Sequence, residues 1–272
     1  MKQLKVKVIE NRRLARGFYK MRLSSAYLAK HSRPGQFVEV KCSCDGEALL
    51  RRPLGVHRIW SGGIEVLYEV VGKGTKALSS GKRGDSLDVI GPLGKGFTLS
   101  AGVKPALIVA GGMGVAPLLC LAEKLAAGKI RPYVMIGAKT ASRILCEKEF
   151  KKLGCFVTVA TEDGSKGSKG LVTDLLRNTP ACRRGGQYAI RNTIYACGPH
   201  PMLKAVSHIA DSSGIPCQVS MEERMACGVG VCMGCPVKVH KTSTQYAILN
   251  TQYEYKMVCK DGPVFDAKEI AW

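Results

Sequence analysis

Cysteines and glycines crowd into residues 224–237, which read RMACGVGVCMGCPV. The three cysteines of this stretch are Cys227, Cys232 and Cys235, and Cys259 follows after 23 intervening residues. Cysteine thiolates bind iron and zinc, and nearby glycines let a backbone turn closely around a metal group. The residue types and their crowding therefore predict a metal site near the end of the chain.

The spacing of these cysteines, C-x4-C-x2-C followed by one distant cysteine, is typical of plant-type 2Fe–2S clusters. In such a loop the backbone N–H groups point at the sulfur atoms, and Gly228, Gly230 and Gly234 supply the conformational freedom that this requires. Structural zinc is the alternative, because it also takes four cysteines. Zinc sites usually consist of two C-x2-C pairs, and only one such pair is present here.

The composition describes a globular chain with room for one large domain or two to three small ones. It has 272 residues, of which 46% are apolar and 23% charged. The first ten residues alternate polar and apolar side chains, which indicates a strand and not a signal peptide. No apolar run approaches the roughly 18 residues of a membrane span. We therefore expect a cytoplasmic protein with mostly reduced thiols.

The formal net charge of +20 raises the alternative of a zinc-stabilised nucleic-acid-binding protein. Residues 1–100 carry 19 basic and 8 acidic side chains, whereas residues 219–272 carry six of each. The positive charge is spread over residues 1–218 and forms no basic run. This distribution favours binding of small anions such as dinucleotides, with no nucleic acid as partner.

The pattern of apolar runs predicts a multidomain β and α/β protein. Residues 1–99 hold short strand-like runs separated by glycine and proline, which is typical of an antiparallel sheet or small β-barrel. Residues 100–218 alternate strands with helices, which predicts a doubly wound parallel α/β domain. Residues 219–272 form a small C-terminal domain with the cysteine loop.

Four glycine- or proline-containing turns are candidates for binding phosphate or a nucleotide. The stretches RRPLGVH (51–57) and VGKGTKALS (71–79) lie in the predicted barrel, where arginines and backbone N–H groups could hold a flavin diphosphate. The stretch VAGGMGVAPLL (109–119) joins a strand to a helix, although it lacks the full G-x-G-x-x-G. The stretch ACGPHPM (196–202) follows a later strand, at the carboxyl edge where open α/β sheets bind ligands.

These motifs, in this order, resemble the ferredoxin–NADP reductase superfamily. Within it, the chain is similar to the electron transfer subunits of type B, NAD-dependent dihydroorotate dehydrogenase over nearly its whole length. The stretches that carry this resemblance are GKGTKALSSGKRGDSLDVIGPLGKGF, AGGMGVAPL, YACGPHPMLKAV, MEERMACGVGVCMGCPV and VCKDGPVFDAKEI.

The resemblance implies an oxidoreductase component of pyrimidine (UMP) biosynthesis with an FAD-binding β-barrel, an NAD-binding domain and a 2Fe–2S domain. It implies a catalytic partner subunit that carries FMN and oxidises dihydroorotate, in a heterotetramer of two copies of each. Electrons would pass from FMN through the 2Fe–2S cluster to FAD and then to NAD as substrate. No catalytic residue for dihydroorotate itself is expected in this chain.

The resemblance also implies a set of site residues. The expected FAD contacts are Arg52, Pro53, Leu54, Gly55, Leu67, Tyr68, Glu69, Gly74 and Thr75. The expected nicotinamide nucleotide contacts are Gly111, Gly112, Gly114, Cys197, Gly198 and Pro199. The expected ligands of the 2Fe–2S cluster are Cys227, Cys232, Cys235 and Cys259.

Two departures from the family pattern stand out. Gly55 replaces a usual serine, so a hydroxyl that could bond the flavin is missing, and the interval before Cys259 is long enough to predict an extended hairpin over 240–255. A related NAD(P)H–ferredoxin or sulfide reductase subunit is the closest alternative, although those relatives often have aspartate where Cys227 stands. Lys139 and Arg143, which follow a strand, leave NAD and NADP both open.

Overall fold

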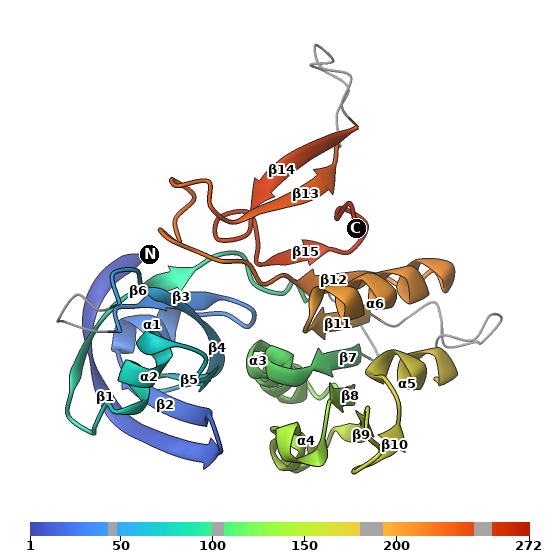
Figure 1. Cartoon of the computed structure of the whole chain (residues 1–272), viewed down its shortest axis with the longest axis horizontal. Helices are drawn as coiled ribbons and strands as arrows, with labels where there is room; N and C mark the ends of the chain where they lie inside the picture. Colours follow the sequence, from blue (N-terminus) through green and yellow to red (C-terminus); the bar gives the residue numbers. More distant parts are fainter. Residues whose placement is uncertain (43–47, 100–105, 180–192, 242–251) are drawn as a thin grey trace.

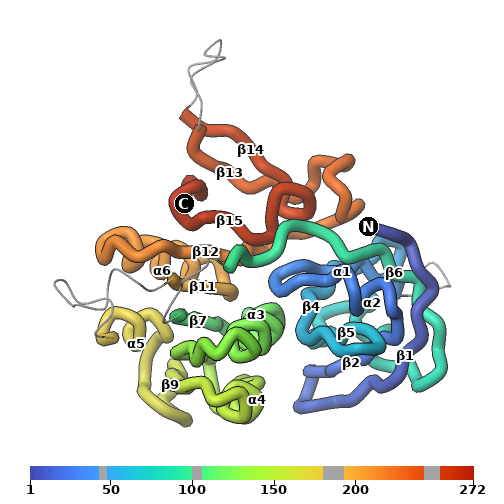
Figure 2. Tube along the Cα trace, turned by 180° about the vertical axis from the view of Figure 1, so that it is seen from behind, coloured from blue at the N-terminus to red at the C-terminus, as the bar shows by residue number. Residues whose placement is uncertain are grey.

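Three parts make up the computed structural model, which describes residues 1–42, 48–99, 106–179, 193–241 and 252–272. Figure 1 shows a barrel on one side, a sheet with helices on the other, and a hairpin above them. Figure 2 shows the same arrangement from behind, with the C-terminal segment resting across the tops of both larger parts. Among the described residues, no helix combines the length and the apolar character that crossing a membrane requires.

Six antiparallel strands close the barrel in the order β1-β2-β5-β4-β3-β6. Alternate residues along each strand point inward, as the pleat of a strand requires, and Val8, Leu23 and Val66 are fully buried there. The strands are β1 (Lys2–Ala15), β2 (Phe18–Ser24), β3 (Phe37–Val40), β4 (Arg52–Trp60), β5 (Gly63–Glu69) and β6 (Ser86–Leu93). Two short helices, α1 (Ala26–His31) and α2 (Lys73–Ser79), cross between strands.

A seven-stranded sheet with the order β10-β9-β8-β7-β11-β12-β15 forms the second part. Its strands are parallel except for β15, which runs antiparallel to β12. The strands are β7 (Ala106–Gly111), β8 (Tyr133–Ala138), β9 (Phe156–Thr161), β10 (Ser168–Lys169), β11 (Thr193–Cys197), β12 (Cys217–Ser220) and β15 (Val264–Asp266). The order reverses between β7 and β11, which makes their carboxyl ends the switch point of the sheet.

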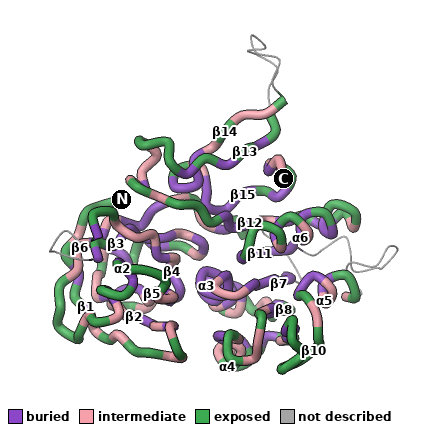
Figure 3. The backbone as a smooth tube through the Cα atoms, viewed as in Figure 1, coloured by how far each residue is buried: buried purple, intermediate pink, exposed green. Residues whose placement is uncertain are grey.

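Helices cover both faces of this sheet. Helix α3 (Val115–Ala127) and helix α4 (Glu147–Lys152) pack on the face that carries Ile108 and Ile136, whereas α5 (Val172–Asn178) and α6 (His200–Ser212) pack on the face that carries Val109. The core around α3 also includes barrel residues, and Figure 3 shows much of this helix and of β7 in the colour of buried residues. The predicted β-barrel and doubly wound α/β arrangement are confirmed.

Strands β13 (Pro236–His240) and β14 (Tyr253–Met257) form the antiparallel pair predicted for the long interval, and residues 242–251 between them lie outside the described residues. Their inner side chains Val237 and Val239 share a core with α6 and the sheet. Strand β15 then returns to the sheet edge. Strand β12 spans the proposed boundary at 218/219 and pairs with β15. The sheet therefore contains residues of two of the three predicted domains. The limits of these domains stay a prediction.

The sequence reasoning missed the segment between β8 and β9. It contains the short 3-10 helix η2 (Ala141–Arg143) and α4, whose sequence EKEFKK is too short to show a helical period. Only Phe150 of α4 is buried. This segment packs against the barrel. The contact between the barrel and the part that contains the seven-stranded sheet therefore includes residues for which the sequence predicted no helix or strand.

Candidate functional site

The four cysteines of the predicted metal site lie in a loop over residues 227–235, here called the cluster loop, and in a turn after β14. The pairing of β13 with β14 brings Cys235 and Cys259 together, and the Cys259 N–H donates to Cys235 Sγ at 3.4 Å. Within the loop, the Cys232 N–H donates to Cys227 Sγ at 3.5 Å. The four thiols therefore stand in two pairs.

Backbone N–H groups of the cluster loop point at these sulfur atoms. Val229 donates to Cys227 Sγ at 3.4 Å, and Gly230 donates to Cys259 Sγ at 3.1 Å. Burial pushes the pKa of Cys227 upward, but the N–H groups of Cys232 and Val229 outweigh it and lower the pKa to about 6. Burial and the neighbouring Cys235 thiol raise the pKa of Cys259 to about 12. Donors that stabilise sulfur charge are the environment that an anionic iron–sulfur cluster requires.

The pairing of the thiols fits a two-iron cluster better than a single ion. A tetrahedral zinc ion needs all four ligands at one point, whereas the four cysteines of a 2Fe–2S cluster serve two irons. No disulfide joins any of the four cysteines.

A buried carboxyl lies directly beneath the cluster loop. Gly228 has a φ of +69°, and a Cβ placed on it would lie 2.5 Å from Glu39 Cγ, so both conformation and space require glycine. Glu39 is fully buried, burial raises its pKa to about 7, and neither carboxyl oxygen has a hydrogen-bond partner among the described residues. Since Glu39 pairs with Pro53 in the β3–β4 ladder, it stands between the cluster loop and the RRPLG motif.

A cavity of about 460 Å³, here called the barrel cavity, opens beside the RRPLG motif. Eight of the nine residues expected to contact FAD line it: Arg52, Pro53, Leu54, Gly55, Leu67, Tyr68, Glu69 and Thr75. The ninth, Gly74, lies behind Arg52, and a Cβ there would be 2.9 Å from Arg52 Nε. A Cβ on Gly55 would meet Pro117 only at 3.9 Å, so the serine of the family pattern would fit.

The charged and hydroxyl groups of the barrel cavity are held by local bonds. Arg52 Nη1 donates to the carbonyl of Leu50 at 2.7 Å, which leaves other N–H groups of the guanidinium for an anion. Thr75 Oγ1 accepts the N–H groups of Val71 and Gly72 at the start of α2. These bonds fix a cation and a tight turn at one end of the cavity, as a diphosphate requires.

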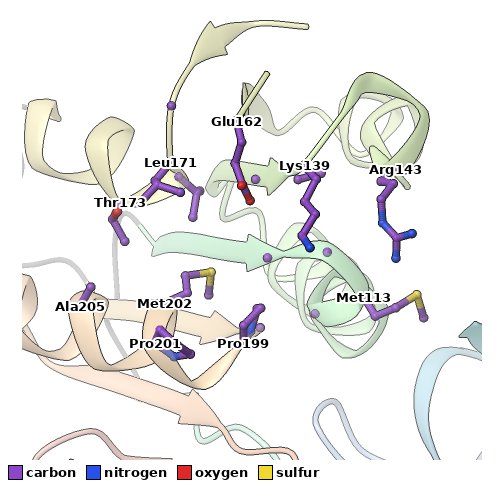
Figure 4. Close-up of a pocket in the computed structure, with 18 of the residues that line it drawn as sticks. Met113, Lys139, Arg143, Glu162, Leu171, Thr173, Pro199, Pro201, Met202 and Ala205 are labelled. Atoms are coloured by element: carbon purple, nitrogen blue, oxygen red, sulfur yellow. The ribbon is translucent and has the colours of Figure 1, made fainter. Parts of the chain in front are cut away.

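A larger cavity of about 730 Å³, here called the sheet cavity, lies along the carboxyl edge of the sheet. Figure 4 shows its lining side chains converging from several elements, with Met113 and Arg143 on one side and Leu171 and Thr173 on the other. Of the six residues expected to contact the nicotinamide nucleotide, the cavity is lined by Gly111, Gly112, Gly114, Gly198 and Pro199. The sixth, Cys197, faces the barrel cavity instead.

The two turns at the switch point touch each other. A Cβ on Gly114 would lie 2.0 Å from the carbonyl oxygen of Cys197, and a Cβ on Gly198 would lie 3.0 Å from Gly111 Cα. The glycine turn after β7 and the CGP turn after β11 can approach this closely only because both consist largely of glycine. Their contact forms the floor of the sheet cavity.

The barrel cavity and the sheet cavity share a wall made of Glu69, Met113 and Glu222. Cys197 lies at this wall, where its thiol is 3.9 Å from Glu222 Oε1. Burial and the Glu222 carboxylate hold the pKa of Cys197 well above its usual value, so the thiol stays protonated at neutral pH. Desolvation likewise raises the pKa of Glu222.

Comparison with known proteins agrees with this geometry. Residues 222–271 match the family described as the iron-sulfur cluster binding domain of dihydroorotate dehydrogenase B, and residues 108–208 match the oxidoreductase NAD-binding domain. The chain is 42% identical over 268 residues to the "Dihydroorotate dehydrogenase B (NAD(+)), electron transfer subunit" of Caldanaerobacter subterraneus subsp. tengcongensis, covering 98% of each. The protein of the same name from Desulforamulus reducens is 37% identical, with 98% of this chain and 97% of that protein covered.

The chain belongs to the family of dihydroorotate dehydrogenase B electron transfer subunits. A solved structure, described as giving insights into flavin-based electron bifurcation via the NADH-dependent reduced ferredoxin–NADP oxidoreductase, superposes with a TM-score of 0.81 at 31% identity. The superposition covers 98% of this chain and 90% of the chain in that structure. The sequence-based predictions of the family, of an oxidoreductase using FAD, a 2Fe–2S cluster and NAD, and of electron transfer to NAD are thereby confirmed.

Several residues of this electron transfer subunit were missed by sequence reasoning. Glu39 belongs to no recognised motif, and only its burial beneath the cluster loop marks it as part of the site. Met113 and Glu222 belong to quoted motifs but were not singled out, although each lines both cavities. Residues 220–223 and Met225, which lead into the cluster loop, line the barrel cavity as well. The sequence signal for them was their position at the start of the stretch MEERMACGVGVCMGCPV or directly before it.

We expect the substitution Arg52→Ala to weaken FAD retention at least about tenfold, because it removes the fixed cation of the barrel cavity. The measurement is flavin per chain after gel filtration, with the dissociation constant obtained by titrating FAD into stripped protein. Arg83→Ala, which removes an arginine outside the lining of either cavity, is the control. Full retention of FAD by Arg52→Ala would place the flavin diphosphate elsewhere.

The substitution Gly114→Ala should abolish NADH binding while FAD is retained, because the added Cβ collides with the Cys197 carbonyl and forces the two turns apart. Gly112→Ala is the matched comparison. Its φ of +54° strains the backbone, but its Cβ meets nothing within 4 Å, so it should weaken NADH binding less. Binding is measured by titrating NADH against flavin absorbance; equal effects of the two variants would contradict the collision argument.

Proposed function

We propose that this chain takes electrons from the catalytic subunit through a 2Fe–2S cluster held by Cys227, Cys232, Cys235 and Cys259. From the cluster the electrons reach FAD in the barrel cavity and then NAD in the sheet cavity. The observation that carries the proposal is the shared wall: Glu69, Met113 and Glu222 line both cavities. The chain runs from Glu222 into the cluster loop within five residues, so all three cofactor positions adjoin one another.

The three cofactors supply the redox chemistry when bound: the cluster carries single electrons, the flavin converts between one-electron and two-electron transfer, and the nicotinamide exchanges a hydride. The protein's part is to hold them in contact and in order. Holding two reacting groups in a fixed geometry can lower the activation barrier of their reaction by about 7 to 11 kcal/mol at best. The interlocked turns at Gly114 and Cys197 provide such a fixed geometry.

For FAD, we assign the diphosphate to Arg52, Gly74 and Thr75, and the flavin ring to the wall that reaches Cys197. Pro53, Leu54, Gly55 and Leu67 provide an apolar lining, and Tyr68, which also lines the cavity, donates its hydroxyl to Asn11 at 3.0 Å. Arg52 supplies the positive charge that an anionic diphosphate requires. Glu69 stands at the end of this lining, where the sheet cavity begins.

For the nicotinamide nucleotide, we assign the diphosphate to the turn that includes Gly111, Gly112 and Gly114 at the start of the 13-residue helix α3. The CGP turn then directs the nicotinamide toward the shared wall. There the protonated Cys197 thiol presents a neutral surface to the transferring hydride. Glu222, whose pKa is raised by burial, lies beside it, with Oε1 3.9 Å from the Cys197 thiol.

The proposal includes a catalytic partner that carries FMN, in an assembly of two copies of each subunit, acting in the cytoplasm. The cluster loop supports a partner here, because it presents exposed apolar side chains around Cys232: Val231 is 79% exposed and Met233 is 61% exposed. Apolar side chains of that exposure favour burial in an interface. A neutral balance of charge over residues 219–272 keeps the cost of such burial low.

An NADPH-dependent ferredoxin reductase of the same superfamily is the second candidate, favoured by the similarity to the ferredoxin–NADP oxidoreductase structure. Lys139 and Arg143 left the choice between NAD and NADP open in the sequence, but the guanidinium of Arg143 lies 2.7 Å from Glu69 Oε1 and is already paired. Lys139 remains in the lining of the sheet cavity, close to Glu162 in Figure 4. A faster reduction of the flavin by NADPH than by NADH would favour this second candidate.

The decisive test is reconstitution. The isolated chain should pass electrons from NADH to an artificial acceptor dye but leave dihydroorotate unchanged, because the base and the flavin that oxidise that substrate are assigned to the catalytic subunit. Addition of the catalytic subunit should produce dihydroorotate-dependent reduction of NAD. The variant Cys232→Ser should lose this coupled activity and the electron paramagnetic resonance signal of the reduced cluster. Coupled activity without a cluster, or dihydroorotate oxidation by the chain alone, would contradict the proposal.

A further inference from the structure

A buried group of charged residues lies between the barrel and the nucleotide-binding part, away from every cofactor assignment made above. Lys20 of β2 is 6% exposed at its side chain, and its ammonium lies 2.9 Å from Glu149 of α4 and 3.8 Å from Glu65 of β5. The fully buried His57 of β4 lies beside them, with Nε2 3.8 Å from Glu65. A fully desolvated cation costs several kcal/mol unless it is well paired, so this arrangement calls for an explanation.

The members of this group come from opposite sides of one interface. Lys20 and Glu65 are on the outer face of the barrel, because their neighbours Met21, Ile64 and Val66 point into its interior. Glu149 belongs to the segment between β8 and β9. The Lys20–Glu149 pair therefore joins the barrel to α4, and the Lys20 ammonium holds the pKa of Glu149 below its usual value although burial opposes it.

His57 makes a second connection, this time to α3. Its Nδ1–H donates to the carbonyl oxygen of Ala116 at 2.8 Å, and burial lowers its pKa to about 3, so the ring is neutral and keeps this bond at any physiological pH. Ala116 lies in the first turn of α3, two residues after Gly114, and it lines the barrel cavity. The imidazole thus ties the start of the nucleotide-binding helix to the flavin-binding strand β4.

Two further ion pairs cross the same interface on either side. Arg58 Nε lies 2.7 Å from Glu123 of α3, and Arg143 of η2 lies 2.7 Å from Glu69. Arg143 also lies over the Phe18 ring, 5.1 Å from its centre. An interface between two parts of one chain permits relative motion by default unless specific contacts prevent it. Here four contacts cross the interface, and one of them, Arg143 with Glu69, lies at the wall at which the two cavities meet.

We propose that Lys20 and Glu149, together with the His57 bond to Ala116, are positioning residues for hydride transfer: they set the nicotinamide-binding turn at a fixed distance from the flavin. The inference rests on the proposed FAD and nicotinamide sites. None of these three side chains lines either cavity, so their effect is on alignment and not on binding. Misplacement of reacting groups by about 1 Å can cost on the order of 100-fold in rate.

The test is the anaerobic stopped-flow reduction of bound FAD by NADH in the full chain. In Lys20→Met, the apolar stem is kept and the charge removed, and the limiting rate at saturating NADH should fall about tenfold or more. The NADH concentration that gives half this rate should change less than about threefold, and FAD content and the cluster signal should be unchanged. The long-wavelength absorbance of the nicotinamide–flavin contact should weaken in parallel.

Two variants make the test specific. Glu149→Gln removes the partner from the more accessible side of the interface, and it decides the question if Lys20→Met does not fold. If the pair acts as a unit, the double variant should lose no more rate than either single variant. Lys151→Met, which breaks the exposed pair with Glu147 on the same helix, is the control and should leave the rate unchanged.

The outcomes separate this inference from the proposed sites. If Lys20→Met or Glu149→Gln retains FAD and reduces it within twofold of the unaltered rate, the positioning role is overturned. It is equally overturned if NADH affinity falls while the limiting rate stays constant. If the proposed cofactor sites are wrong, Arg52→Ala would retain FAD or Gly114→Ala would retain NADH. These two results are measured independently of the Lys20 variants.

Discussion

The contact between Gly114 and the Cys197 carbonyl is the constraint on which the rest of the site depends. No side chain fits between the turn after β7 and the turn after β11, so the two turns meet backbone to backbone at the switch point of the sheet. Because α3 begins at this contact, its first turn lines the barrel cavity while the glycine turn lines the sheet cavity. This close approach of backbone to backbone lies where the two cavities share a wall.

The cluster loop is attached to this wall by the chain itself and by a shared core. Residues 220–223 line the barrel cavity before the chain enters the loop, and Cys235 and Cys259 are buried among apolar side chains of α6, β12 and β13. Glu39 and Gly228 bring the loop into contact with the barrel from below. The cluster position is therefore determined by both larger parts, which suits a carrier that must lie close to the flavin.

The sequence predicted the features that rest on local chemistry. Cysteine spacing identified the cluster, glycine turns next to strands identified the nucleotide edge, and alternation identified the barrel strands. It could not predict α4 and η2, which are too short to show periodicity, or the burial of Lys20, His57 and Glu39, which depends on contacts between distant segments. The placement of Cys197 on the flavin side of the wall likewise follows only from the tertiary structure.

The central claim is that FAD stands between NAD and the cluster, with no direct route between the last two. Mixing NADH anaerobically with protein stripped of FAD tests this most directly, with the cluster followed by electron paramagnetic resonance in rapidly frozen samples. The account predicts that the cluster stays oxidised without FAD and becomes reduced once FAD is restored. Reduction of the cluster by NADH at an undiminished rate in FAD-free protein would contradict it.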